Sequence, residues 1–171
     1  DRIESRGLGD VYKRQTQAGI DVLKSGGNAV DAAIAACATL CVVEPAMTGI
    51  GGDCFVLYSP YNSSQPIALN GSGKSPAAAN VANLRDRGVE QMEVETPHAV
   101  NVPGAIAAWT RLNTDYGTKD LTELLRPAIN YAKNGFPVAP RVALDWVDNL
   151  PKLLGDEVSS KILTVSGEAP K

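Results

Sequence analysis

The chain has 171 residues, of which 44% are hydrophobic and 20% charged, and its formal net charge at pH 7 is −3. This composition is typical of a globular protein with a buried core and not of a disordered chain. The small excess of acidic residues argues against a protein that binds nucleic acid through its phosphates. The longest apolar stretch, residues 32–43, is too short for a membrane-spanning helix, which needs roughly 20 residues.

The beginning of the chain differs in character from the remaining sequence. Residues 1–15 mix charges of both signs with glycine and follow no hydrophobic period. We interpret them as a disordered or non-native extension and expect the incomplete folded domain to cover residues 16–171. The extension contains no apolar core of a secretory signal, and the sequence leaves the compartment open between the periplasm or exterior and the cytoplasm.

Two helices are predicted next. The apolar positions of residues 18–23 are spaced for a helix that stops at Gly26-Gly27. Asn28 is typical of a helix N-cap, with Asp31 placing negative charge in the first turn. The following helix, residues 29–43, is apolar nearly all round and rich in alanine, which predicts a central helix that other elements approach closely.

A β-hairpin and further helices come after these. Residues 54–58 predict a buried strand and residues 67–69 its hairpin partner. Further helices are expected at residues 81–87, 105–116, 121–134 and 143–150. Asp120 and Glu123 resemble a capping box, Pro127 is expected to kink or restart its helix, and Pro151 is expected to end the last one before a polar tail. The predicted fold class is α/β (α+β), mostly helical with a short β-hairpin.

One loop resembles a phosphate-binding loop. Residues 68–75 end in Gly-Lys-Ser, as a Walker A motif does, although Ala68 stands where its first glycine is usual. In such a loop the lysine and serine open a helix, and Pro76 disfavours a helical conformation at Ser75. Because the Gly-Lys-Ser end is complete, we keep nucleotide binding by residues 68–75 as an alternative function, although it belongs to a different class of protein from the enzyme interpretation below.

A second loop is rich in glycine. Gly49, Gly51 and Gly52 predict a tight turn in which side chains would not fit, and this turn is either structural or close to a substrate. The three cysteines form no Cys-x-x-Cys pair and His98 is the only histidine, so we expect no metal and no cofactor. No catalytic constellation is recognisable.

Four blocks of the sequence resemble the gamma-glutamyltranspeptidase family. They are AGIDVLKSGGNAVDAA at 18–33, VEPAMTGIGGDCF at 43–55, VPG at 102–104 followed by Trp109, and RPAI through GFPV at 126–138. The second block is similar to the family's E-P-x-x-S-G-I-G-G-G-x-F. The resemblance implies an N-terminal-nucleophile hydrolase with a four-layer αββα sandwich, made as a precursor that cleaves itself into a large and a small subunit.

The resemblance also implies a reaction and partners. The new N-terminal threonine of the small subunit attacks the γ-glutamyl amide of glutathione or a related compound, and the acyl group passes to water or to an acceptor amine. This chain resembles only the N-terminal part of the large subunit, and Thr164 does not match the nucleophile block. We therefore expect no catalytic residue here. The expected partners are the remainder of the large subunit, the small subunit and a small-molecule amide.

The loop after the hairpin departs from the family pattern. Ser72 stands where the family has an arginine that binds the α-carboxylate of the glutamyl group. Gly73 stands where the family has a glutamate. Lys74, two residues further along the chain, carries a positive charge that replaces the charge of the missing arginine from a different position. We expect Ser72 and Lys74 to be substrate-binding residues. The loop is also similar to acylase-like branches, so an acylase acting on another amide, such as a glutaryl type, is the second candidate.

Overall fold

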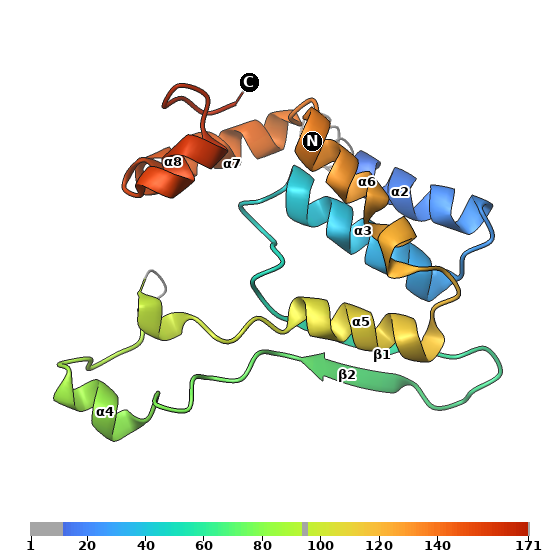
Figure 1. Cartoon of the computed structure of the whole chain (residues 1–171), viewed down its shortest axis with the longest axis horizontal. Helices are drawn as coiled ribbons and strands as arrows, with labels where there is room; N and C mark the ends of the chain where they lie inside the picture. Colours follow the sequence, from blue (N-terminus) through green and yellow to red (C-terminus); the bar gives the residue numbers. More distant parts are fainter. Residues whose placement is uncertain (1–11, 94–95, 171) are drawn as a thin grey trace, which may run out of the picture. The chain divides into compact units, whose positions relative to one another are not determined.

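The computed structural model describes residues 12–93 and 96–170 of the chain (Figure 1). These residues form two compact units. The first contains the described residues up to Gly49 and those from Asp115 onward, and the second contains Ile50–Thr114. Most of the extension predicted for residues 1–15 lies outside the described residues and stays a prediction; the first helix already begins at Lys13.

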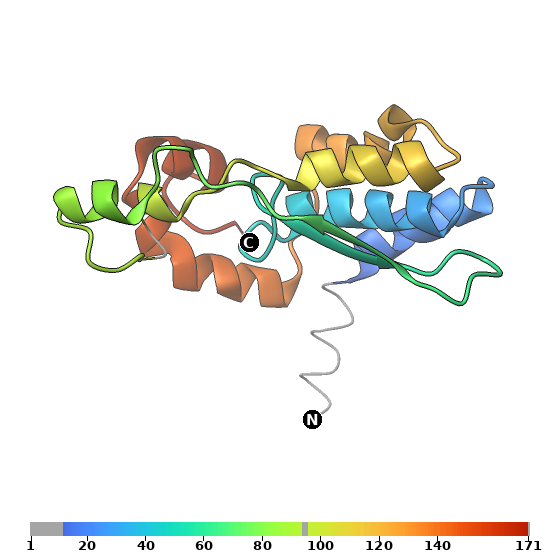
Figure 2. The same ribbon diagram turned by 90° about the horizontal axis from the view of Figure 1, so that it is seen from below.

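The regular elements of the first unit are helices, and an isolated β-bridge pairs Val165 with Glu168. It contains α2 (Lys13–Lys24), α3 (Ala29–Val43), α6 (Leu121–Asn134), α7 (Pro140–Leu154) and α8 (Glu157–Leu163). Helix α3 contacts both α2 and α6, and the three lie side by side in Figures 1 and 2. Helix α7 contacts α8. Within this unit α3 is therefore central, as its all-round apolar composition predicts.

Small residues allow α2 and α3 to approach closely. A Cβ added to Gly19 would lie 3.3 Å from the carbonyl oxygen of Ala32 and 3.7 Å from the Cβ of Ala36. Ile34 and Ala35 are completely buried. The predicted bounds of α3 are confirmed, and so is its N-cap: the Asn28 side chain accepts a hydrogen bond from the Asp31 N–H at 3.0 Å, and the Asp31 side chain accepts one from the Asn28 N–H.

Two predictions for the later helices are wrong, and one of the two alternatives for Pro127 is excluded. Pro127 does not start a second helix, because α6 runs through it to a C-cap at Gly135, and the alternative of a kink stays a prediction. The Asp120 side chain caps α6, but Glu123 does not complete a capping box, because its carboxylate pairs with the Lys119 ammonium at 2.9 Å. Pro151 does not end α7, which continues to Leu154.

Packing explains the longer α7 and the structure of the polar tail. Trp146 is buried in a cluster with Val142, against which Leu153 and Leu163 pack. The indole N–H of Trp146 also donates a hydrogen bond of 2.7 Å to the carbonyl oxygen of Leu163, at the end of α8. These contacts offset the backbone hydrogen bond lost at Pro151. They also order the polar tail that contains α8, whose sequence shows no hydrophobic period of its own.

The second unit contains the hairpin and three helical segments. Strands β1 (Cys54–Tyr58) and β2 (Ile67–Gly71) pair antiparallel, with Cys54 opposite Gly71 and Tyr58 opposite Ile67. The helical segments are α4 (Val81–Asp86), the 3₁₀ turn η1 (Pro97–Ala99) and α5 (Ala105–Tyr116), whose last two residues belong to the first unit. The predicted strand pairing is confirmed.

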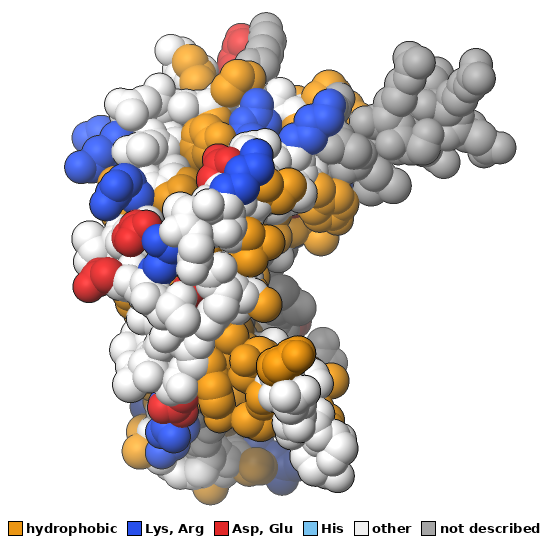
Figure 3. Space-filling model, turned by 90° about the vertical axis from the view of Figure 1, so that its right-hand side faces the viewer, with side chains coloured by type: hydrophobic (Ala, Val, Ile, Leu, Met, Phe, Trp, Pro, Cys, Tyr) orange, Lys and Arg blue, Asp and Glu red, His pale blue; other side chains and the backbone are white. Residues whose placement is uncertain are grey.

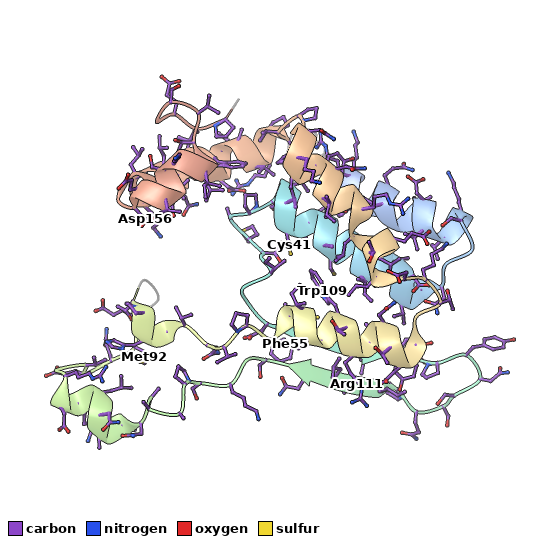
Figure 4. All side chains as sticks on the ribbon, in the orientation of Figure 1. Cys41, Phe55, Met92, Trp109, Arg111 and Asp156 are labelled. Atoms are coloured by element: carbon purple, nitrogen blue, oxygen red, sulfur yellow. The ribbon has the colours of Figure 1, made fainter. Side chains whose placement is uncertain are left out.

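The prediction that β1 is buried is wrong in this chain. Phe55 and Leu57 are 70% and 76% exposed, whereas Val56 between them is half-buried. Alternate side chains of a strand point to opposite faces, so one face of the hairpin carries these exposed apolar side chains. Phe55 is labelled in Figure 4. Figure 3 shows hydrophobic side chains reaching the surface at several places among charged ones.

None of the helices among the described residues is both long enough and apolar enough to span a membrane.

Candidate functional site

Three loops of the second unit meet next to the hairpin. They are residues 51–53 before β1, residues 70–74 at the end of β2, and residues 101–105 before α5. The carbonyl oxygen of Gly52 accepts hydrogen bonds from the N–H groups of Gly104 and Ala105, at 3.1 and 3.0 Å. The N–H of Val102 donates to the carbonyl oxygen of Lys74 at 2.9 Å. These bonds tie the start of α5 to both of the other loops.

Side chains hold the loop that contains Ser72 and Lys74. The N–H of Ser72 donates to the side-chain oxygen of Asn70 at 2.9 Å. The N–H of Gly73 donates to the Asp53 carboxylate at 2.8 Å, a contact between residues 20 positions apart. Because the acceptor is charged, this second bond is of the stronger kind.

The same loops pack backbone against backbone. A Cβ added to Gly73 would overlap the carbonyl oxygen of Val102, and a Cβ added to Gly104 would overlap the carbonyl oxygen of Gly71. At Gly71 an added Cβ would lie 2.5 Å from the Cβ of Ala108 on α5. Glycine is therefore required at these positions because another segment occupies the space of a side chain.

The steric prediction for the earlier glycine loop is wrong for two of its residues. A Cβ added to Gly49 or Gly51 meets no described atom within 4 Å. Gly52 acts through its backbone, because its carbonyl oxygen holds the start of α5. A structural role and a place near a substrate both remain open for Gly49, Gly51 and Gly52.

The two predicted substrate-binding residues lie on this anchored loop. Ser72 and Lys74 are both exposed. Within residues 12–93 and 96–170, no acceptor is found for the Lys74 ammonium. The loop thus presents a hydroxyl and an ammonium group from a backbone that the protein holds in place. Together they can recognise an anionic group such as a carboxylate.

The geometry contradicts the phosphate-loop alternative. Lys74 and Ser75 open no helix, since the next helix, α4, begins at Val81. A phosphate loop also needs free backbone N–H groups, and here those of Ser72 and Gly73 already donate to side chains.

Two buried carboxylates lie in the first unit, at the two ends of α3. Burial alone would raise the pKa of Asp31, but hydrogen bonds from the Thr118 hydroxyl and from the N–H groups of Asn28, Thr118 and Lys119 hold this pKa below its ordinary value. Burial raises the pKa of Glu44; the negative charge of Asp145 adds to this rise and Arg141 opposes it. The capping role predicted for Asp31 is confirmed.

Thr164 lies at the C-cap of α8. The hydroxyl of Thr164 donates to the carbonyl oxygen of Ser160 at 2.6 Å and accepts from the Gly167 N–H at 3.2 Å, so it shapes the end of α8. Among the described residues, no group of three or more His, Cys, Asp or Glu side chains could hold a metal ion.

Sequence reasoning missed Asp53. A signal was present, because Asp53 stands where the family block E-P-x-x-S-G-I-G-G-G-x-F has its fourth and last glycine. The reason for a carboxylate there appears only when β1 and β2 pair, since pairing brings Asp53 to the Gly73 N–H.

Comparisons with known proteins agree with this architecture. The sequence model of the gamma-glutamyltranspeptidase family matches residues 15–171. The glutathione hydrolase-like YwrD proenzyme of Bacillus subtilis is 37% identical over 156 residues, which are 91% of this chain and 29% of that protein. The oxamate amidohydrolase proenzyme of Klebsiella pneumoniae is 34% identical and covers 91% of this chain and 30% of its own length.

A solved structure extends the likeness to three dimensions. The cephalosporin acylase from Bacillus halodurans superposes with a TM-score of 0.85 at 38% identity, over 92% of this chain and 30% of that one. The fold is thus a portion of an N-terminal-nucleophile hydrolase, mostly helical with a short hairpin, as predicted. The chain belongs to the gamma-glutamyltranspeptidase family. It spans less than a third of the length of these curated relatives.

Proposed function

We propose that the protein containing this chain cleaves a γ-glutamyl amide, as in glutathione, through an N-terminal threonine supplied by the small subunit. The threonine oxygen attacks the amide carbonyl carbon, the amine leaves with a proton, and an ester-linked acyl-enzyme remains. Water or an acceptor amine then takes the acyl group and the threonine regains its proton. The remainder of the large subunit and the small subunit would complete the site.

The observation that carries this proposal is the anchored loop with its exposed Lys74. A γ-glutamyl group ends in a carboxylate, and an ammonium group on a fixed backbone suits such an anion. The name of the similar Bacillus subtilis proenzyme, glutathione hydrolase-like, supports the same substrate class.

A second candidate is an acylase that cleaves another amide. Ser72 favours it, because serine cannot make the two parallel charged hydrogen bonds that arginine makes to a carboxylate. The oxamate amidohydrolase and the cephalosporin acylase among the similar proteins favour it as well. Both candidates share the threonine chemistry and differ in the acyl group.

Three anilide substrates distinguish the candidates in the full-length enzyme. The γ-glutamyl anilide carries both the carboxylate and the amine, the glutaryl anilide only the carboxylate, and the 4-aminobutyryl anilide only the amine. We expect Lys74→Ala to lower kcat/KM about tenfold to a hundredfold on the two substrates with a carboxylate and to leave 4-aminobutyryl anilide unchanged.

Substitution at Ser72 provides the complementary test. If Lys74 already binds the carboxylate, Ser72→Arg raises kcat/KM on the γ-glutamyl anilide only slightly. If the acylase candidate is correct, the wild-type enzyme cleaves the glutaryl anilide, which lacks the amine, at least as well as the γ-glutamyl anilide, and Ser72→Arg raises activity on both of these substrates and not on the 4-aminobutyryl anilide. Equal effects of both substitutions on all three substrates would contradict a role of this loop in acyl recognition.

A further inference from the structure

Just beyond the last paired residues of the hairpin, the Asp53 carboxylate joins the segment before β1 to the segment after β2. Cys54 and Gly71 form the final pair of the two strands. One position before Cys54, the side chain of Asp53 accepts the N–H of Gly73 at 2.8 Å. An aspartate at this position therefore reaches a part of the loop that backbone pairing does not hold.

The next residue of the loop is held from the opposite side. The carbonyl oxygen of Lys74 accepts the N–H of Val102 at 2.9 Å, and the absence of a side chain at Gly73 lets Val102 come this close. Asp53 thus fixes the backbone just before Lys74, and Val102 fixes it just after. With both sides anchored, the direction in which the Lys74 side chain leaves the backbone is set.

We propose that Asp53 is a positioning residue, which holds the backbone of Lys74 so that its ammonium group meets the carboxylate of the acyl substrate. The inference rests on the proposed function. Lysine has a long flexible side chain, and ordering it on binding costs conformational entropy. An anchored backbone lowers that cost because only the side chain remains to be ordered.

Two substitutions at Asp53 separate its charge from its hydrogen bond. Asp53→Asn keeps an oxygen that can accept the Gly73 N–H and removes the charge, whereas Asp53→Ala removes both. On the γ-glutamyl anilide, we expect Asp53→Ala to raise KM about tenfold with kcat nearly unchanged, and Asp53→Asn to keep KM within about threefold of wild type. On the 4-aminobutyryl anilide neither substitution should matter.

The double variant tests whether Asp53 acts through Lys74. If it does, Asp53→Ala combined with Lys74→Ala loses no more activity on the γ-glutamyl anilide than Lys74→Ala alone. Losses that multiply would overturn the proposal, and so would an equal loss on the 4-aminobutyryl anilide. A loss in Asp53→Asn as large as that in Asp53→Ala would also overturn it, because the hydrogen bond would then not be the cause.

Hydrogen exchange gives a readout that needs no activity. In the full-length protein the Gly73 amide should exchange about tenfold faster in Asp53→Ala than in wild type, and Asp53→Asn should preserve its protection. Asp148→Asn, which removes an exposed carboxylate from α7, is the matched control and should change nothing. Unchanged exchange in Asp53→Ala would overturn the inference. Absence of anilide cleavage with altered exchange would instead contradict the proposed function.

Discussion

The hydroxyl of Thr118 donates a hydrogen bond of 2.6 Å to the carboxylate of Asp31, which is completely buried at the start of α3. The same carboxylate accepts the N–H groups of Thr118 and Lys119 and that of Asn28. One side chain therefore caps α3 and attaches to it the segment that leads into α6.

This network predicts an acid-sensitive contribution to stability. Hydrogen bonds hold the folded pKa of Asp31 below its ordinary value of 3.8, so the unfolded state binds a proton more readily. The contribution is complete well above pH 3.8 and is lost as the pH falls through the folded pKa. Thr118→Val should lower the free energy of unfolding by about 1.5–3 kcal/mol at pH 7 and by less in acid.

Urea denaturation of wild type and Thr118→Val at a series of pH values measures this effect. Thr110→Val, an exposed substitution on α5 whose hydroxyl donates to the carbonyl oxygen of Ile106, serves as the control for replacing a threonine that does not contact a carboxylate. A difference between Thr118→Val and wild type that does not shrink as the pH falls would contradict the assignment to the Asp31 carboxylate.

The central position of α3 predicts unequal costs for two truncations. Ile34 is 1% exposed, whereas Leu40 is half-buried. In the full-length protein Ile34→Ala should cost about 2–5 kcal/mol of unfolding free energy, since it leaves a cavity in a closed environment. Leu40→Ala should cost less, unless parts of the protein outside this chain cover it. Denaturation midpoints measure both, and an unchanged midpoint for Ile34→Ala would place α3 at the periphery.

The glycine contacts predict opposite results for two similar substitutions. Gly104→Ala should destabilise the protein by about 1–3 kcal/mol and disturb the loop of Ser72 and Lys74, because the added methyl group overlaps the carbonyl oxygen of Gly71. Gly49→Ala should be tolerated, because no described atom lies within 4 Å of the added Cβ. Thermal denaturation compares the two, and equal destabilisation would indicate that Gly49 contacts residues outside those described.

The exposed hairpin face predicts self-association of the 171-residue chain on its own. Phe55 and Leu57 expose large apolar side chains from the same face of β1. Replacing both by lysine should raise the concentration at which the chain stays monodisperse, since charges on a strand oppose further pairing. Light scattering measures this. Val56→Lys, on the other face of the strand, should instead destabilise the hairpin. Unchanged association of the double variant would contradict a role of the hairpin face and would indicate that exposed apolar side chains of α7 and α8 cause the association.

Local patterns determined most of the helices and the hairpin. The bounds of α3 follow from a side chain that caps its start at Asn28 and a proline that ends it after Glu44, both within a few residues of the helix. The pairing of β1 with β2 follows from two apolar runs separated by turn residues. The family is recognisable for the same reason, because its motifs are continuous stretches of sequence.

Only the tertiary structure decided the remaining features. Pro151 stays inside α7 and α8 forms because Leu153 and Leu163 pack at Trp146, and packing energy overrides local preference. The strict need for glycine at Gly73 and Gly104 and the contact of Asp53 with Gly73 arise from segments far apart in sequence. Such contacts have no period or motif, because the partner of each residue is set by the way the chain folds back on itself.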